Sequence, residues 1–277
     1  MTAPILVTGG TGTLGSRVTR RLRDAGRPFR VLTRRAGRGE AGLVVTGDLT
    51  TGEGVDAALS GVETVIHCAG TNKGDDDKAR HLMRAAERAG ARHVVFISVV
   101  GADRIPVESA LDRAMFGYFA SKLAAEKVVA ASSVGWTTLR ATQFHDLVLK
   151  VARHMTRLPV VPVGLGFRFQ PVDTDEVAAR LVELALGAPA GLVPDLAGPR
   201  VSEMAALMRT YLAVTHKRRL VVPVWIPGKG ARAVRAGATL SPDRAVGVRT
   251  WDAFLADAER EGLAGAGRPP LTSARAT

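Results

Sequence analysis

The fold of this chain is decided by the stretch Thr8-Gly9-Gly10-Thr11-Gly12-Thr13-Leu14-Gly15. An apolar run, residues 5–7, leads straight into it, and apolar residues at helical spacing (Leu14, Val18, Leu22 and Ala25) follow it. This order predicts a strand, a glycine turn and a helix. Glycine lets such a turn bend sharply, lets backbone amides approach a pyrophosphate, and lets the helix pack close to the strand. Because the helix then presents unpaired N–H groups to an anion, the stretch predicts a nucleotide-binding site.

The length of 277 residues allows one large α/β unit or two small domains, and an apolar share of 46% supplies a core. The chain enters a strand pattern by residue 4, so no secretory signal is predicted, and no apolar run approaches transmembrane length. The single cysteine, Cys68, excludes an internal disulfide and fits a reducing cytosol. We therefore expect a cytoplasmic protein with no membrane partner.

The formal net charge is +12, from 38 basic and 26 acidic residues, and such a charge can indicate a polyanionic partner. Arginines are scattered along the chain, however, and Ala, Gly, Val and Arg are all used heavily, which indicates compositional bias. No helix-turn-helix or aromatic-rich RNA motif stands out. We therefore expect no nucleic-acid partner, while some positive charge suits a phosphate-bearing cofactor.

The first 140 residues alternate between strand and helix patterns. The predicted strands are short apolar runs, as expected for a parallel sheet with helices on both faces: Ile5–Val7, Phe29–Thr33, Leu43–Thr46, Thr64–His67, His93–Ile97 and Thr137–Arg140. One helical pattern contains Leu82, Met83, Ala86 and Ala89 and ends at Gly90, a predicted C-cap. This alternation predicts an α/β fold of the Rossmann type, with a doubly wound parallel sheet and right-handed crossovers.

After about residue 141 the regularity fades, and prolines and glycines interrupt the pattern. Two further helices are predicted, at Asp173–Leu186 and Val201–Val214. We see no internal repeat and no clean linker. The prediction is one unit over residues 1–263, with a sheet core at about 4–140 and a smaller, less regular substrate-binding portion at about 141–263. Residues 264–277 are polar or small and are predicted to form a flexible tail.

The end of the second predicted strand indicates the choice of cofactor. A chain that selects NAD usually places an acid there to hold the ribose 2′-OH. Here the residues are Thr33, Arg34 and Arg35, with no acid. Guanidinium groups pair well with a 2′-phosphate, so the sequence favours NADP, although a solvated basic loop is the plainer alternative.

Two more strand ends carry candidate contacts. Asp48, in the segment 47–49, either accepts a hydrogen bond from an adenine amino group or caps the turn into the next helix, and the sequence leaves both open. The segment His67–Gly70 contains small residues that would let a cofactor lie against the backbone. Nothing near Cys68 in the sequence argues for a lowered thiol pKa, so it is not predicted to be a nucleophile.

Tyr118 and Lys122 are the sharpest catalytic candidates. They are four residues apart in a helical pattern from Phe116 to Ala131, so their side chains share one face. A neighbouring ammonium lowers the pKa of a phenol, and the phenol can then give a proton to a carbonyl oxygen as hydride arrives. The plainer alternative is a tyrosine that packs on the sheet.

Together these motifs resemble a short-chain dehydrogenase/reductase of the atypical, NmrA-like type. The matching segments are TGGTGTLG (8–15), LTRR (32–35), GDL (47–49), HCAG (67–70), FISVVGAD (96–103), YFASK (118–122), LRATQFHDLV (139–148) and FQPVDTDEVA (169–178). The resemblance implies a Rossmann fold with NADP along the strand ends and Lys122 at the nicotinamide ribose. It also implies that Gln143, Phe144 and His145 line the substrate side.

The residues predicted to bind the cofactor lie at the ends of the first five predicted strands, and Lys122 lies in the helical pattern that follows them. They are Gly9, Thr11, Gly12, Thr13, Leu14, Gly15, Arg34, Arg35, Asp48, Leu49, Cys68, Ala69, Gly70, Ser98 and Lys122. No metal site is predicted. The expected partner is a small-molecule substrate.

The chain departs from the resemblance at one position. Active reductases of this superfamily usually keep a serine just past the fifth strand, whereas here Ser98 is followed by Val99 and Val100. Loss of an oxyanion partner is worth about 10²–10³ in rate if nothing replaces it. His145 is a candidate replacement, and a core or helix-capping histidine is the plainer alternative. We expect an NADP-dependent oxidoreductase that transfers hydride to a small apolar carbonyl, imine or activated double bond. The alternatives are a redox sensor that binds NADP(H) and acts through a protein partner, and an epimerase or lyase on the same fold.

Overall fold

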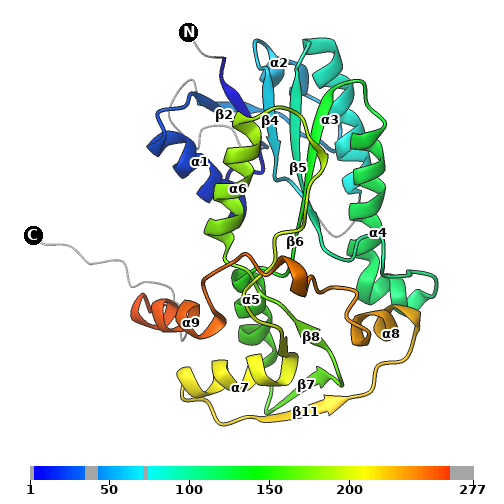
Figure 1. Cartoon of the computed structure of the whole chain (residues 1–277), viewed down its shortest axis with the longest axis vertical. Coiled ribbons are helices and arrows are strands. Elements are labelled where there is room, and N and C mark those ends of the chain that lie inside the picture. The colour runs from blue at the N-terminus through cyan, green and yellow to red at the C-terminus, as the bar shows by residue number, and fades with distance from the viewer. Residues whose placement is uncertain (1–2, 35–42, 71–73, 263–277) are drawn as a thin grey trace, which may run out of the picture.

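The structure is a computed structural model that describes residues 3–34, 43–70 and 74–262. Its largest sheet has seven parallel strands within these described residues, in the order β3-β2-β1-β4-β5-β6-β9 (Figure 1). The strands are β1 (Ile5–Thr8), β2 (Phe29–Thr33), β3 (Val44–Thr46), β4 (Thr64–His67), β5 (His93–Val99), β6 (Gly135–Ala141) and β9 (Gly191–Leu192). Each of the six predicted strands is present, and the Rossmann-type fold is confirmed.

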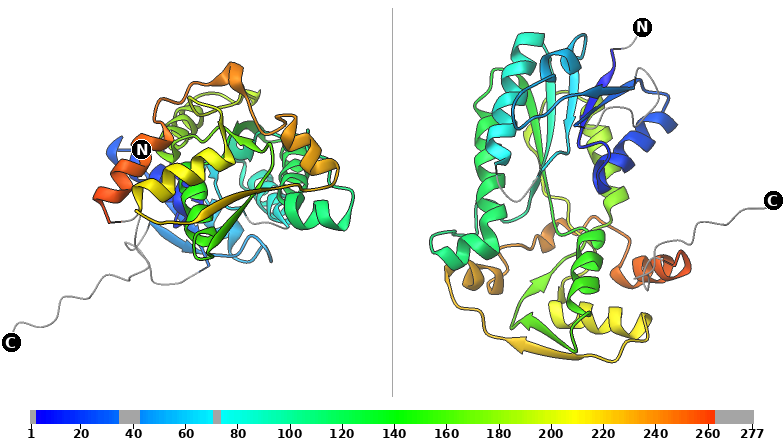
Figure 2. Two further views of the ribbon diagram at one scale, coloured as in Figure 1. Left: turned by 90° about the horizontal axis from the view of Figure 1, so that it is seen from below. Right: turned by 180° about the vertical axis from the view of Figure 1, so that it is seen from behind.

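Helices cover both faces of this sheet, which is why its central strands are continuous apolar runs (Figure 2). One face packs on α1 (Thr13–Asp24) and α6 (Thr174–Leu186), and the apolar side chains between them form the first core. The other face packs on α2 (Val55–Leu59), α3 (Asp75–Ala89) and α4 (Ala110–Ala130) and forms the second core. The predicted C-cap of α3 is confirmed, because Gly90 has the left-handed φ of +70°.

The helix that carries Tyr118 begins six residues before its predicted start at Phe116. Ser109 caps α4 in a reciprocal box, in which its side chain accepts from the Asp112 backbone and the Asp112 carboxylate accepts from the Ser109 backbone. The residues before Phe116 do not pack on the core, because Leu111 and Met115 share one face of the helix and both are exposed.

The C-terminal portion lies at the carboxyl ends of the sheet strands and contains two small sheets, β10–β8 and β11–β7 (Figures 1 and 2). A third core, which includes Tyr211, Trp251 and Leu255, holds its helices together. Its elements are α5 (His145–Met155), β7 (Val160–Gly164), β8 (Arg168–Phe169), β10 (Ser202–Glu203), α7 (Met204–Val214), β11 (Leu220–Val224), α8 (Lys229–Arg235), the 3-10 turn η1 (Pro242–Arg244) and α9 (Trp251–Arg260).

The two portions are interleaved along the chain. After α5 and β8, the chain returns to the main sheet through α6 and β9, where Thr137 pairs with Gly191. The fifteen residues of α6 and β9 thus belong to the sheet layers, although they follow residue 140 in the chain. Arg17 of α1 binds Asp146 of α5 at 3.0 Å and Asp175 of α6 at 3.2 Å. This interleaving supports treating residues 1–263 as one unit; the predicted tail from residue 264 lies outside the described residues.

A buried ion pair holds α4 against β6. Arg140 donates to both carboxylate oxygens of Glu126, at 2.9 and 2.6 Å, and to Asp103 at 2.8 Å. The side chains of Arg140 and Glu126 are only 11% and 10% exposed, and the two carboxylates raise the pKa of the guanidinium despite its burial. Because α4 carries Tyr118 and Lys122, this pair also positions the candidate catalytic residues.

We predict that Glu126→Ala lowers the free energy of unfolding by about 3 kcal/mol, because it leaves the Arg140 charge buried without its main partner. The matched control is Glu63→Ala, which breaks the exposed pair with Arg92 and should cost less than about 1 kcal/mol. Urea unfolding of both variants measures the difference. Equal losses for the two variants would contradict a special role for the buried pair.

Candidate functional site

Two glycines of the first turn are required by close contacts. Gly9 has a φ of +67°, and a Cβ at this position would lie 2.7 Å from the backbone nitrogen of Ala69. A Cβ at Gly15 would lie 2.1 Å from the carbonyl oxygen of Gly9. Gly9 therefore lets the turn approach the end of β4, and Gly15 lets α1 pack against the turn.

Gly12 has a different environment. Its φ is −83°, and a Cβ there would meet only the Gly9 carbonyl oxygen, at 3.3 Å. Thr11, Gly12 and Thr13 are exposed, and the first turn of α1 carries no acidic residue and no side-chain cap. The Gly12 N–H donates to the Gly9 carbonyl at 2.9 Å, and the uncapped first turn of α1 leaves N–H groups that fit a diphosphate. Leu14 packs its side chain in the core, so only its backbone could take part.

The end of β4 is tied to the end of β1 by a threonine. The hydroxyl of Thr8 lies 2.6 Å from Nδ1 of His67 and accepts from the Ala69 backbone at 3.3 Å. Burial, followed by the charge of Lys122, lowers the pKa of His67 to about 3, so this histidine is neutral. Burial raises the pKa of the Cys68 thiol to about 12. The thiol is therefore a poor nucleophile, in agreement with the sequence interpretation.

Lys122 lies in a buried pocket between α3, α4 and the strand ends. Its ammonium is 3.2 Å from a carboxylate oxygen of Asp75, donates to the Ile97 carbonyl at 3.3 Å, and lies 4.9 Å from the ring centre of Phe96. A Cβ at Gly70 would lie 2.9 Å from the same nitrogen. Desolvation lowers the pKa of Lys122, and Asp75 opposes that effect.

Asp75 was missed by the sequence analysis. It is 1% exposed, its backbone N–H donates to Ser121 at 3.3 Å, and Lys78 also contacts its carboxylate at 3.3 Å. Three consecutive aspartates begin α3, and acids are common in a first helical turn. Nothing in that run distinguishes the one that turns inward.

Tyr118 lies one turn before Lys122 on the same face of α4, as predicted, with the Lys122 ammonium 5.9 Å from its ring centre. The expected lowering of the phenol pKa is wrong for this structure. Burial, and then the charge of Asp75, raise the pKa of Tyr118 to about 12. The phenol is therefore protonated at neutral pH, which is the form that donates a proton.

The position of the missing serine is filled by apolar side chains. β5 runs through Val99, and Val99 and Val100 are both buried. Ser98 is 4% exposed, and its hydroxyl has no hydrogen-bond partner among the described residues. Side chains alternate along a strand, so Ser98 shares a face with Phe96 and therefore lies toward Lys122.

The ends of β2 and β3 are only partly described. Arg34 is exposed at the end of β2, whereas Arg35 lies outside the described residues. Asp48 uses one carboxylate oxygen to accept from the Thr50 backbone at 2.8 Å, and this bond lowers its pKa. The turn-capping alternative is thus present in the structure. Leu49 packs in the second core.

The three residues expected on the substrate side have structural contacts. Gln143 donates to the Thr239 carbonyl at 3.2 Å and accepts from the Gln170 backbone at 3.1 Å. Phe144 is partly buried against the first core. His145 is fully buried, its Nε2 lies 2.9 Å from the Arg249 carbonyl, and burial lowers its pKa. Its role as a replacement for the missing oxyanion partner is therefore not supported, because it is packed between Trp251 and Phe254.

An apolar wall beside Tyr118 comes from residues that are distant in the sequence. It combines the segment after β5, the start of α4, Phe167 and the helix α8, and its buried members are Ile105, Phe116, Phe167, Ala231 and Val234. Gly230 allows the approach, since a Cβ there would lie 2.5 Å from the Phe116 ring. Phe119 packs on this wall and against the ring of Tyr118. Only the tertiary fold brings these segments together.

Other features of the described residues lie away from this site. A cavity of about 180 Å³ opens between α7 and the start of α9 and is lined by Pro171, Arg200, Ser202, Leu207, Trp251 and Asp252, among others. No group of three metal-ligating side chains occurs among the residues the structure describes. Within the same residues, no helix is both long and apolar enough to cross a membrane.

Comparisons with known proteins agree with this geometry. Residues 9–186 match the family model described as NAD(P)H-binding. The ceramide reductase of Caulobacter vibrioides is 31% identical over 208 residues, which is 68% of this chain and 63% of that protein. The NAD(P)H azoreductase of Xenophilus azovorans is 37% identical over 187 residues, or 65% of this chain and 62% of that protein. This chain thus spans less than two thirds of the length of these relatives.

Among solved structures, the NADPH-dependent quinone oxidoreductase of Escherichia coli in complex with NADPH superposes with a TM-score of 0.75. The two are 19% identical, and the match covers 91% of this chain and 99% of that one. This likeness shows the fold. The family match covers more than half of the chain and contains the glycine turn, the β4 end, Tyr118 and Lys122. The chain therefore belongs to the NAD(P)H-binding family, and it has the Rossmann-type fold.

Proposed function

We propose that this protein is an NADPH-dependent reductase of a small apolar carbonyl, imine or activated double bond. The observation that carries the proposal is the placement of Tyr118 and buried Lys122 on one face of α4, where Lys122 meets the ends of β4 and β5. The glycine turn after β1 approaches the same end of β4 at Ala69. A dinucleotide along these strand ends would reach both.

The residues present fit such a cofactor. The exposed start of α1 at Thr11–Thr13 would hold the diphosphate through backbone N–H groups, and Gly12 leaves it room. Arg34, which has no acidic neighbour in the sequence, would pair with the 2′-phosphate of NADP. Lys122 and the unpartnered hydroxyl of Ser98 would face the nicotinamide ribose. When bound, the reduced cofactor supplies a hydride.

Tyr118 would supply the proton. Its phenol keeps the proton at neutral pH, and the Lys122 ammonium, held nearby by Asp75, would stabilise the phenolate left after the transfer. A positioned acid of this kind contributes about 10²–10⁴ in rate. The partly exposed side chain of Phe119, which packs on the apolar wall and against the Tyr118 ring, favours an apolar substrate. The relatives named above are reductases, which supports the same reaction class.

One observation favours a second function. Val99 and Val100 fill the place where a substrate-holding serine is expected, so a redox sensor that binds NADP(H) and acts through a protein partner is the alternative. A sensor would bind the cofactor without consuming it. An epimerase or lyase on the same fold would turn over with no net redox change. A cytoplasmic location stays a prediction.

The first test of the proposed function concerns the diphosphate site. Gly12→Val should abolish NADPH binding while the protein still folds, because the backbone there is extended and only the Gly9 carbonyl is close. Gly187→Val, at a second extended glycine remote from the site, is the matched control and should bind normally. Isothermal titration measures both. Normal NADPH affinity in the folded Gly12→Val variant would place the phosphate site elsewhere.

The second prediction concerns cofactor choice. Arg34→Ala should weaken NADPH binding by about 1.5–3 kcal/mol and leave NADH binding unchanged, since the lost hydrogen bond involves charged groups. Arg30→Ala, at the other end of β2, is the control and should change neither affinity. Titration of both cofactors decides the matter. An NADH preference in the wild type would refute the assignment to NADP.

The third prediction concerns the proton donor. Tyr118→Phe should lose about 10²–10⁴ in turnover and keep its NADPH affinity, because only a hydroxyl is removed. Lys122→Ala should lose both. The only other tyrosine in the chain is Tyr211, which lies in the third core, so Tyr211→Phe is the control. The measurement is steady-state reduction of quinone, imine and enone probes. Unchanged turnover in Tyr118→Phe would make Tyr118 a packing residue, and no turnover by the wild type would favour the sensor.

A further inference from the structure

The two-stranded sheet of β7 and β11 exposes an apolar face. Opposite residues in a parallel pair point to the same side, so the pair Val160 and Leu220 shares a face with Val224. These three side chains are 42%, 66% and 42% exposed. The exposed side chains of Leu158 and Leu165, at the two ends of β7, and of Trp225, directly after β11, flank it. We call these six residues the β7–β11 surface.

The opposite face of the same sheet packs against the third core. Val161 and Val163 are buried in the third core with α5, α7 and α9, and Val221 packs against that core. Both faces of this sheet are therefore apolar, although one of them covers nothing among the described residues. An exposed apolar patch of this kind marks an interaction surface.

Basic charge is concentrated around this surface. Residues 147–172 and 204–242, which form most of α5, β7, β8, α7, β11 and α8, hold eleven of the 38 Lys and Arg residues and none of the 26 Asp and Glu residues. The rest of the chain is close to neutral. The composition is biased along the whole chain, and these two stretches differ from the rest by their lack of acids. Residues 17–38, far from the β7–β11 surface, hold a second concentration of basic residues, with nine Arg and one acid.

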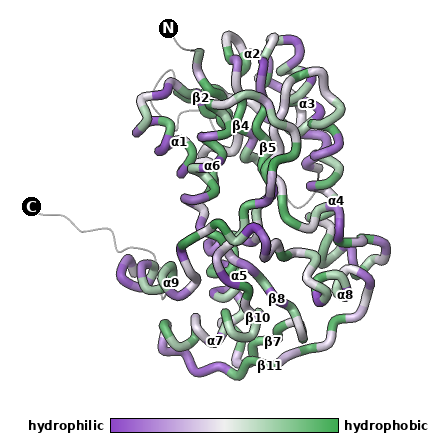
Figure 3. The backbone as a smooth tube through the Cα atoms, viewed as in Figure 1, coloured by the Kyte–Doolittle hydropathy of each residue, from purple (hydrophilic) through white to green (hydrophobic). Residues whose placement is uncertain are grey.

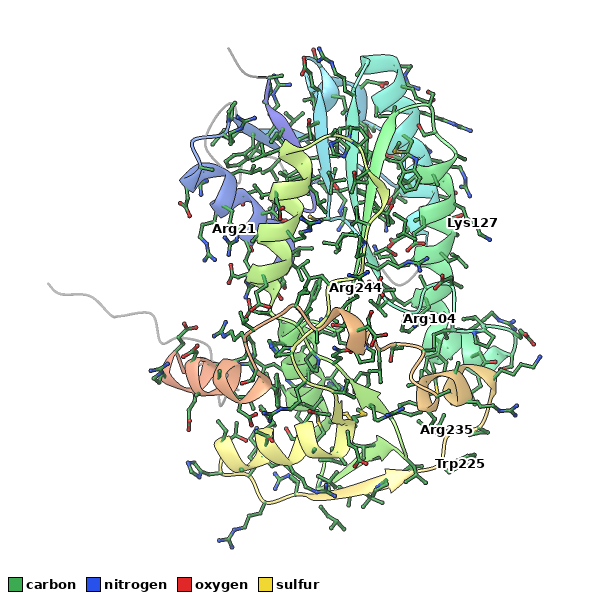
Figure 4. The ribbon with its side chains drawn as sticks, viewed as in Figure 1. Arg21, Arg104, Lys127, Trp225, Arg235 and Arg244 are labelled. Carbon is green, nitrogen blue, oxygen red and sulfur yellow. The ribbon has the colours of Figure 1, made fainter. Side chains whose placement is uncertain are left out.

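The basic residues flank the apolar face at both ends. Arg157 precedes β7 and the run Lys217–Arg219 precedes β11, so the pairing of Val160 with Leu220 brings them to the same end. Figure 3 shows this hydrophilic turn before β11. Arg157 and Arg218 are exposed and make no ion pair with a carboxylate in the part of the chain described here. At the other end, the Arg235 guanidinium lies 3.9 Å over the Trp225 ring, at the edge of the molecule (Figure 4).

The side chains of the β7–β11 surface indicate which kind of binding partner it fits. A second copy would bring two strongly basic surfaces together, and Pro162 and Pro223 limit pairing along the strand edges. Single-stranded nucleic acid would need several aromatic platforms, whereas five of the six exposed side chains are aliphatic. Aliphatic residues with one tryptophan, ringed by Lys and Arg, are typical of a surface that enters the interface of an anionic bilayer.

We propose that the β7–β11 surface docks this protein on a lipid bilayer that carries anionic headgroups. Its apolar side chains enter the interface, and Arg157, Arg218 and their neighbours contact the headgroup phosphates. Such binding is peripheral and needs no spanning helix. The proposed membrane binding does not depend on the proposed reductase activity, so an experiment can refute one proposal without refuting the other.

Vesicle flotation with the full chain tests the proposal. The protein should float with phosphatidylcholine vesicles that contain phosphatidylglycerol, should float weakly with phosphatidylcholine alone, and should be released by salt. Arg157→Glu/Arg218→Glu should reduce the bound fraction more than about tenfold. The matched control is Arg84→Glu/Lys127→Glu, which makes the same charge change on α3 and α4 and should bind as the wild type does.

Tryptophan emission provides a second measurement. Vesicles with phosphatidylglycerol should shift the wild-type emission to the blue, and Trp225→Phe should bind while it loses most of that shift. All of these positions are exposed, so circular dichroism should be unchanged. Equal binding to both vesicle types, no binding, or equal losses in the control would overturn the proposal. Tighter binding to a single-stranded oligonucleotide, or a dimer that Leu220→Gln dissociates, would identify a different occupant.

Discussion

The contact between the Lys122 ammonium and the Asp75 carboxylate, at 3.2 Å, is the interaction on which the site depends. An isolated charge buried this deeply costs several kcal/mol, so each group needs the other. The pair joins the start of α3 to the middle of α4 and lies against the ends of β4 and β5. The pair therefore fixes the position of Tyr118 relative to the ends of β4 and β5.

The same pair decides the protonation states around it. Lys122 helps to keep His67 neutral, and Asp75 adds to the burial that keeps the Tyr118 phenol protonated. Cys68, at the same strand end, stays a thiol. The neighbouring groups are thus neutral at physiological pH, and the formal charges of this region are concentrated on Lys122, Asp75 and Lys78.

The parallel sheet and its turns were predictable because they follow from local pattern. The fold was predicted from apolar runs such as 64–67 and 93–97, which mark the strands, and from the glycines between strand and helix. The site was predictable as far as Tyr118 and Lys122, whose spacing alone places them on one face. The wall of Phe116, Phe167 and Val234 was not, because it depends on which distant segments meet. Asp75 and His145 were not predictable for the same reason. The role of a titratable side chain depends on its burial, and burial cannot be read from a single sequence.

The interleaved path of the chain has an evolutionary consequence. The polypeptide leaves the sheet after β6, builds part of the C-terminal portion, returns through α6 and β9, and then leaves again. No single cut separates the layers of the main sheet from the C-terminal portion. Recombination that exchanges one contiguous segment would break both. A protein built in this way acquires a new specificity by substitutions and loop insertions around a retained sheet, and its two portions are inherited together.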